Sequence, residues 1–154
     1  MRDRRSSASR GWIAFRAARN LPASALALAW ALHHGATVFV GEDLFVECSG
    51  MPRGTYGRGG TTVGNVWLHG DLGGERRRRH ELRHADQYAL LGTLPFLALY
   101  GLNALVTRNL PHRNVFERWA GLEDGGYARP ARRRQGRRRQ GRTRTARTAT
   151  SSSA

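Results

Sequence analysis

Residues 72–92 read LGGERRRRHELRHADQYALLG, and the pentapeptide HELRH occupies positions 80–84. Two glycines precede the charged run and Gly92 follows the last apolar residue, so the pattern predicts a helix that begins near Leu72 to Glu75 and ends at Gly92. One helical turn separates His80 from His84, which places both side chains on one face, about 6 Å apart along the axis. The opposite face carries small apolar side chains, at Leu82, Ala85 and Ala89. We therefore expect one side of this helix to pack against the protein and the other to face a cleft.

The spacing of His80, Glu81 and His84 is typical of metal chemistry. Two imidazoles on one helical face can hold two corners of a tetrahedral zinc ion, and the adjacent Glu81 lies where a general base is needed to take a proton from water. The sequence thus predicts a zinc-dependent hydrolase, with a peptidase as the first candidate. The competing interpretation is a pair of solvent-exposed histidines among arginines, with no metal and with Glu81 as one more surface carboxylate.

A catalytic zinc site needs a third protein ligand as well as an open position. Glu117 is the first candidate, because residues 114–122 (NVFERWAGL) predict a short helix that follows the motif helix. The alternative role of Glu117 is structural, since Asn114-x-x-Glu117 is also a capping-box-like pattern in which the carboxylate bonds the start of the helix. Less favoured third ligands are His69, His112, Glu123 and Asp124.

Three further side chains are candidates to support the chemistry. Gln87 lies one turn beyond His84 on the same face, and it either bonds a ligand or a substrate carbonyl or is an ordinary surface amide. Tyr88 and Tyr100 are candidates to stabilise an oxyanion, although buried packing is the simpler interpretation of both.

The arginine run Arg76–Arg79 directly precedes His80. The default interpretation of such a run is solvated helix surface. Arg77 falls near the ligand face, where its charge opposes metal binding or, alternatively, holds a substrate carboxylate.

The residues before the motif predict a small antiparallel sheet. Residues 36–40 (ATVFV) and 43–48 (DLFVEC) flank Gly41-Glu42 as a tight hairpin, and residues 61–69 (TTVGNVWLH) are predicted to form a third strand. A strand directly before a zinc helix matters for mechanism, because such an edge strand pairs with an extended peptide through main-chain hydrogen bonds.

Two apolar segments lie on either side of these elements. Residues 16–32 have Pro22 near the expected helix start, and we favour a packed or membrane-facing helix over a cleaved signal peptide. Residues 88–107 carry no charge and have the length of a membrane span, but Gly92 and Pro95 favour a break followed by a second buried helix over residues 96–106. Contact with a membrane surface stays open, because Arg-rich segments flank the apolar ones.

The composition is strongly basic. The formal net charge is +15, and all 26 basic residues are arginines. Cys48 is the only cysteine, which excludes a disulfide within the chain and a cysteine-rich metal site. The last residues, 128–154, have no large apolar side chains to bury and are expected to be disordered. A second function hypothesis is therefore a non-catalytic protein that binds nucleic acid nonspecifically and salt-dependently through this tail; a third is a small membrane-associated protein.

Several segments together resemble the zincin superfamily, and within it the gluzincin type, in which a Glu is the third zinc ligand. More narrowly, the chain resembles a family of small bacterial zincin-like, metallopeptidase-like proteins. The matching segments are residues 21–22 (LP), 60–66 (GTTVGNV), 80–88 (HELRHADQY), 91–96 (LGTLPF), Tyr100 and 114–120 (NVFERWA). The resemblance implies zinc bound by His80, His84 and Glu117, with Glu81 as the catalytic base. The chain departs from the family pattern in Arg76–Arg79 and at Arg83, where a small residue is common, and neither departure removes a ligand.

We therefore expect a minimal zincin-like α+β domain over residues 16–127, with a small antiparallel sheet, an HExxH active-site helix and two further helices. Residues 1–15 are expected to form a flexible basic N-terminus and residues 128–154 a disordered Arg-rich tail. The expected cofactor is Zn²⁺ and the expected substrate a peptide or protein. The expected location is cytoplasmic, with a membrane surface as a further candidate partner.

Overall fold

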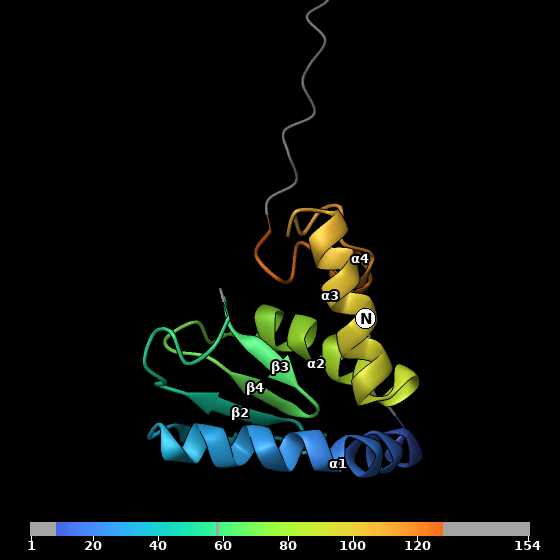
Figure 1. Ribbon diagram of the computed structural model, residues 1–154. Coiled ribbons are helices and arrows are strands. Elements are labelled where there is room, and N and C mark those ends of the chain that lie inside the picture. The colour runs from blue at the N-terminus through green and yellow to red at the C-terminus, as the bar shows by residue number, and fades with distance from the viewer. Residues whose placement is uncertain (1–8, 58, 128–154) are drawn as a thin grey trace, which may run out of the picture.

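The computed structural model describes residues 9–57 and 59–127, which form an α+β fold with four helices and one four-stranded sheet (Figure 1). The elements, in chain order, are α1 (Arg10–His33), β1 (Thr37–Val40), β2 (Val46–Ser49), β3 (Thr61–Val63), β4 (Val66–Leu68), α2 (Glu75–Leu91), α3 (Thr93–Val106) and α4 (Val115–Ala120). The expected tail, residues 128–154, and the first eight residues lie outside the described residues.

The sheet is mixed, so the expectation of a purely antiparallel sheet is wrong. Its strand order is β1-β2-β4-β3, in which β1–β2 and β3–β4 are antiparallel hairpins and β2–β4 is a parallel pair. Residues 61–69, expected to form one strand, fold back on themselves at Gly64-Asn65. Gly64 has a φ of 61°, and an added Cβ would meet Ser24 Oγ at 2.6 Å, so only glycine fits this two-residue turn.

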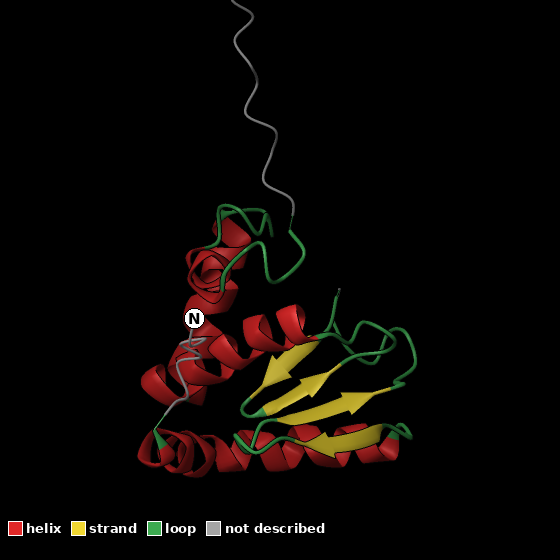
Figure 2. Ribbon diagram, turned by 180° about the vertical axis from the view of Figure 1, so that it is seen from behind, coloured by secondary structure: helices red, strands yellow, loops and turns green. Residues whose placement is uncertain are grey.

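The sheet lies between α1 and α2 (Figures 1 and 2), and the alternation of side chains along β4 explains why. Val66 and Leu68 point to one face, where they join the small residues Ala27 and Ala31 of α1 in a buried cluster. Trp67 points to the other face and packs against Ala85 of α2. One short strand thus supplies side chains to both hydrophobic clusters.

Helix α1 begins at Arg10, inside the segment that was expected to be a flexible N-terminus. The Ser9 side chain caps it by accepting a hydrogen bond from the Trp12 amide, and Trp12 and the buried Arg16 both bond Asp86 of α2. Pro22 therefore lies in the middle of the helix and not near its start, at an exposed position where water can satisfy the backbone group that proline leaves unpaired.

Helix α2 has the limits expected from the sequence, and Gly92 ends it. Two buried polar contacts fix the helix in place. The Asn20 side-chain amide donates to the Ala85 carbonyl at 2.9 Å and to Asn65 at 3.2 Å, and Arg16 forms an ion pair with Asp86 at 3.0 Å. Both contacts come from α1, so they hold α2 against α1, and Asn20 also joins the β3–β4 turn through Asn65.

Helix α3 follows a break at Gly92, as expected, but it is not the buried helix that the sequence indicated. Phe96 is its only buried residue, whereas Leu94 and Leu105 are each 78% exposed. No single helix among residues 9–57 and 59–127 is long and apolar enough to cross a membrane; α2 and α3 together have that length and composition but are bent by 119° at their junction.

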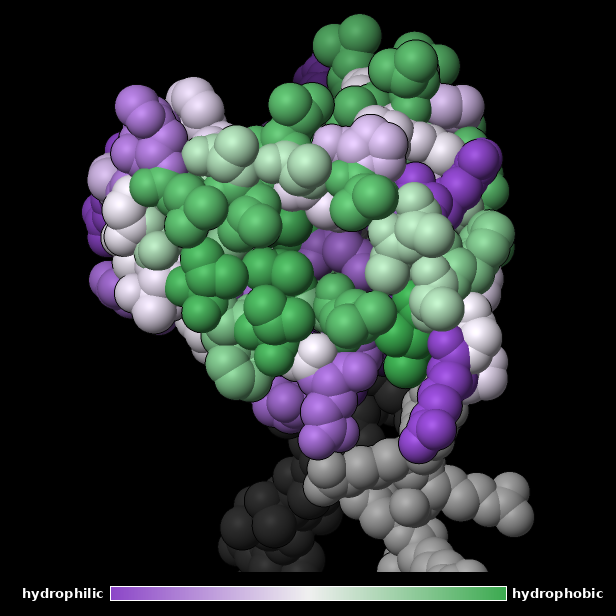
Figure 3. Space-filling view, turned by 90° about the horizontal axis from the view of Figure 1, so that it is seen from below, coloured by the Kyte–Doolittle hydropathy of each residue, from purple (hydrophilic) through white to green (hydrophobic). Residues whose placement is uncertain are grey.

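A second apolar surface lies on the outward side of α1. Leu21, Leu26 and Leu32 are all more than half exposed there. Figure 3, which views the molecule from the side of α1, shows apolar side chains gathered across this face.

Candidate metal centre

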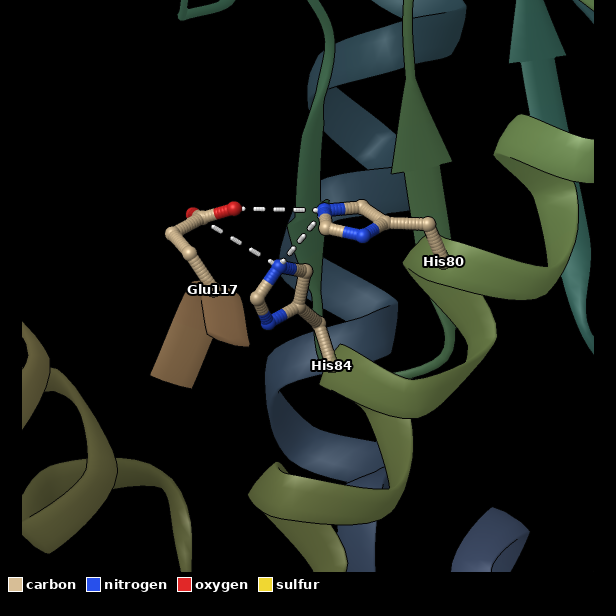
Figure 4. A group of neighbouring side chains, drawn as sticks. All are labelled: His80, His84 and Glu117. Atoms are coloured by element: carbon tan, nitrogen blue, oxygen red, sulfur yellow. Dashed lines mark hydrogen bonds and ion pairs between the residues drawn. The ribbon is translucent and has the colours of Figure 1, made fainter. Parts of the chain in front are cut away.

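Helix α2 carries His80 and His84, and α4, more than 20 residues later in the chain, brings Glu117 beside them (Figure 4). His80 Nε2 lies 3.2 Å from His84 Nε2 and 3.2 Å from Glu117 Oε2, and His84 Nε2 lies 3.7 Å from Glu117 Oε1. One ligand atom from each residue falls within 4.8 Å of the others, and all three side chains are buried. This spacing leaves room for one ion.

Both imidazoles are oriented through their other ring nitrogen. His80 Nδ1 donates to the Gly121 carbonyl at 3.0 Å, and His84 Nδ1 donates to Gln87 Oε1 at 2.8 Å. Since these partners are oxygen acceptors, the hydrogen of each neutral ring sits on Nδ1, and each Nε2 presents a lone pair to the centre. Gln87 is itself fixed, because its Nε2 donates to the Phe116 carbonyl at 3.0 Å.

The donor set fits a cation. Glu117 Oε1 accepts the Tyr100 hydroxyl at 2.5 Å, but Glu117 Oε2 is buried with no hydrogen-bond partner among the described residues. Two imidazole lone pairs and an unsatisfied carboxylate oxygen repel one another unless a positive charge lies between them. Two nitrogens and one carboxylate oxygen at such spacing are the ligands that zinc takes in catalytic sites.

The pKa shifts of His84 and Glu117 both follow from the contact between the imidazoles and the carboxylate. Burial alone would lower the pKa of His84, but the hydrogen bond and the charge of Glu117 outweigh it and raise this pKa. Burial alone would raise the pKa of Glu117, but hydrogen bonds that His80 and His84 donate from Nε2 when protonated, and the charge of His84, lower this pKa well below its ordinary value. The site therefore stabilises a positive charge next to an ionised Glu117, which a proton or a metal ion can supply.

Glu81 lies next to the triad and is held by the sheet. Its Oε2 accepts a hydrogen bond from the Thr62 hydroxyl at 2.8 Å, and both side chains are buried. Thr62 is on β3, which forms one edge of the sheet. Glu81, the triad, and Thr61 and Thr62 all line one cavity of about 540 Å³.

The loop after α4 covers the outer side of His80. Gly125 is so close that an added Cβ would meet the His80 ring at 2.8 Å. Asp124 anchors this loop to α2 through Arg83 at 2.9 Å, and Arg83 also donates to the Ala120 carbonyl at 2.6 Å. The Gly121 carbonyl that orients His80 is thereby fixed by a guanidinium of the motif helix.

The arginine run has structural partners, so solvated surface describes only part of it. Arg78 forms an ion pair with Asp43 at 2.6 Å, and Arg76 and Arg79 lie 3.6 and 3.8 Å from Asp124. Arg77 donates to the Gly59 carbonyl at 3.3 Å. Its guanidinium is thus tied to the loop before β3.

The other sequence candidates have different surroundings. Tyr88 is buried against Phe96, with ring centroids 4.3 Å apart, and it also lines the cavity of the triad. Tyr100 donates a hydrogen bond to the candidate ligand Glu117. Among the less favoured third ligands, His69 pairs with Glu47 at 3.0 Å and Asp124 with the arginines, so neither joins the cluster.

Two functional groups were not foreseen from the sequence, namely the Thr62 hydroxyl and the Gly121 carbonyl. A backbone carbonyl has no residue-type signal at all. Thr62 had a weak one, since it is a polar residue in a strand that was expected to pair with a peptide.

Comparison of the chain with protein-family models, with curated proteins and with solved structures gives no match. The functional argument therefore depends on the site itself.

Proposed function

We propose that this protein is a zinc-dependent hydrolase of peptide bonds, of the gluzincin type. His80, His84 and Glu117 are the zinc ligands and Glu81 is the general base. The observation that carries the proposal is the convergence of two Nε2 lone pairs and an unsatisfied carboxylate oxygen in a cavity that also contains Glu81. In this proposal α2 is the active-site helix, because it carries two of the zinc ligands and the general base.

Zinc bound by these three side chains would act as a Lewis acid and lower the pKa of water towards about 7. Glu81 then needs to be only a weak base. Its carboxylate takes the proton of the attacking water and gives it to the amine that leaves. The Thr62 hydroxyl donates to Glu81 Oε2, so Glu81 Oε1 is the oxygen that exchanges the proton. The same hydrogen bond fixes the orientation of the Glu81 carboxylate.

The edge strand supports a peptide as the substrate. Strand β3 has β4 on one side only, and Thr61 and Thr62 line the cavity with Glu81. An extended peptide that adds to such an edge gains main-chain hydrogen bonds with little sequence preference. Its backbone would then run past the triad and Glu81.

The first test is the zinc content of the purified full chain, measured by elemental analysis. We expect about one zinc per chain in the wild type, none in His80→Ala/His84→Ala, and an unchanged content in His112→Ala, which removes an exposed histidine outside the triad. No zinc in the wild type after reconstitution would overturn the proposal and favour the Arg-rich nucleic-acid-binding alternative.

The second test separates binding from chemistry. Glu81→Gln should keep its zinc and lose hydrolysis of a peptide library by a factor of about 100 or more, because the amide cannot take the proton. A Glu81→Gln protein as active as the wild type would assign the base to another group. Zinc binding without any hydrolysis in the wild type would leave a metal-binding protein and reject the hydrolase.

A further inference from the structure

Helix α3 is apolar on the side that the fold leaves uncovered. Phe96, Tyr100 and Asn103 face the protein, whereas the outward stripe, defined here by Leu94, Leu102, Leu105 and Val106, is between 59% and 78% exposed. A helix without charges and with leucines on its outer side needs a further apolar partner.

The described residues around this stripe are basic. None of residues 87–116 is Asp or Glu. The Arg19 guanidinium lies beside Gly92 at the start of α3, since an added Cβ there would meet it at 3.3 Å. Arg108 and Arg113 are exposed just after the end of α3. Positive charge therefore borders the leucine stripe at both ends.

The rest of this sequence offers nothing to cover the stripe. Apart from Met1, residues 1–8 and 128–154 contain no Leu, Ile, Val, Met, Phe, Trp or Tyr. An apolar partner must come from outside these segments.

We infer that α3 docks on an anionic lipid bilayer, with its leucine stripe in the interface and Arg19, Arg108 and Arg113 on the headgroups. Leucine insertion together with basic residues is the combination that holds helices at anionic membrane surfaces. The helix has 14 residues and is therefore about 21 Å long, shorter than the roughly 30 Å hydrocarbon core, so it lies in the interface.

The outward face of α1 is the competing apolar surface, and the exposed Arg10 and Arg19 lie on the same helix, so it serves as the control for α3. Leu21 and Leu26 are 63% and 75% exposed, close to the values of Leu102 and Leu105, 59% and 78%, so the two pairs make matched variants.

Docking places the cavity at the membrane. Leu97, Phe96 and Tyr100 of α3 line the same cavity as the triad. Membrane binding does not depend on zinc or on hydrolysis, so it can be tested separately from the proposed function.

The direct test uses an environment-sensitive fluorophore on Leu102→Cys and, as the control, on Leu26→Cys in the full chain. The native Cys48 is free but fully buried, so it does not react in the folded protein. With vesicles that contain phosphatidylglycerol, we expect a blue shift for the label at position 102 and a smaller one at position 26. No shift at position 102 would overturn the inference.

The second test measures co-sedimentation with these vesicles at physiological salt. Leu102→Gln/Leu105→Gln should lower partitioning by about tenfold or more relative to Leu21→Gln/Leu26→Gln. The Arg-rich tail is present in every variant, so its own attraction to anionic lipid cancels. Circular dichroism checks that each variant folds. Equal partitioning of both variants would overturn the inference, as would a wild-type dimer in light scattering that Leu102→Gln/Leu105→Gln dissociates, because the stripe would then bind a second copy.

Discussion

Gln87 sets the orientation of the proposed ligand His84 and is itself held by the Phe116 carbonyl of α4. Replacing it with Ala removes the acceptor for His84 Nδ1–H and leaves that ring free to rotate. We expect Gln87→Ala to weaken zinc affinity by about 10- to 100-fold, measured by competition with a chelator of known affinity. Gln87→Glu keeps an oxygen acceptor and should lose less. Equal affinity in wild type and Gln87→Ala would show that packing alone orients His84.

Among the strand residues that the structure describes, Thr62 is the one whose side chain bonds the proposed base Glu81. Thr62→Val keeps the shape of the side chain but removes the hydroxyl, so Glu81 loses its fixed orientation. Hydrolysis should fall about tenfold or more while the zinc content stays the same. Thr62→Ser, which retains a hydroxyl, should recover most of the activity. A loss of zinc in Thr62→Val would instead indicate damage to the fold.

At the residue scale, the sequence predicted the proposed site where chemistry depends on side-chain type. The spacing of His80 and His84 indicated a shared face, and the choice of Glu117 over a helix cap agrees with its contact with His80 at 3.2 Å. Asn114 does cap α4, by accepting from the Phe116 amide. The Gly121 carbonyl was beyond prediction, because a carbonyl takes its role from the path of the chain.

The loop after α4 is an element whose position depends on charge. Asp124 lies within 4 Å of Arg76, Arg79 and Arg83, all on α2. Asp124→Asn weakens these pairs and loosens the loop whose Gly121 carbonyl holds His80. We expect a severalfold loss of zinc affinity with a small loss of stability, about 1 kcal/mol or less, since the arginines are partly exposed. Asp71→Asn, in an exposed loop, is the charge-matched control for both calorimetric and chelator measurements.

The same ion pairs predict a pH dependence. Partial burial would raise the pKa of Asp124, but Arg83, Arg79 and Arg76 outweigh it and lower the pKa. A carboxyl whose folded-state pKa is lowered contributes stability above its unfolded pKa, about 3.9, and the contribution is lost as the pH falls through the folded value. The difference in unfolding free energy between wild type and Asp124→Asn should therefore shrink below about pH 4. A difference that stays constant down to pH 2 would contradict the charge argument.

At the scale of elements, local signals predicted helices better than sheet pairing. The limits of α2 followed from glycines and apolar periodicity. The two strands in residues 61–69 did not, because Gly64 and Asn65 are only two residues within a run of β-forming residues, although such a pair also forms two-residue turns. The burial of α3 was mispredicted because an apolar helix indicates only that a partner exists, and the fold leaves this one uncovered.

In the whole molecule, the candidate site lies where two separate parts of the chain meet. His80 and His84 belong to α2, which packs on the sheet, whereas Glu117 belongs to α4, which reaches α2 only after the outward excursion of α3 (Figure 1). A metal ion that joins them would cross-link α4 to α2 and the sheet. Binding of an ion by the folded state alone stabilises the protein by mass action, so the proposed zinc site has a consequence for unfolding that does not require a substrate.

We therefore expect chelation to lower the melting temperature. With free zinc about 1,000-fold above its Kd, the ion contributes about 4 kcal/mol, and each kcal/mol shifts the melting temperature by about 2–4 °C in a chain of this size. Scanning calorimetry of zinc-loaded and EDTA-treated wild type should differ by roughly 8–16 °C on this basis. His80→Ala/His84→Ala should melt at one temperature in both conditions, because Glu117 alone cannot hold the ion. The same shift in the double variant would place the zinc elsewhere, since the stabilisation would no longer depend on the two histidines.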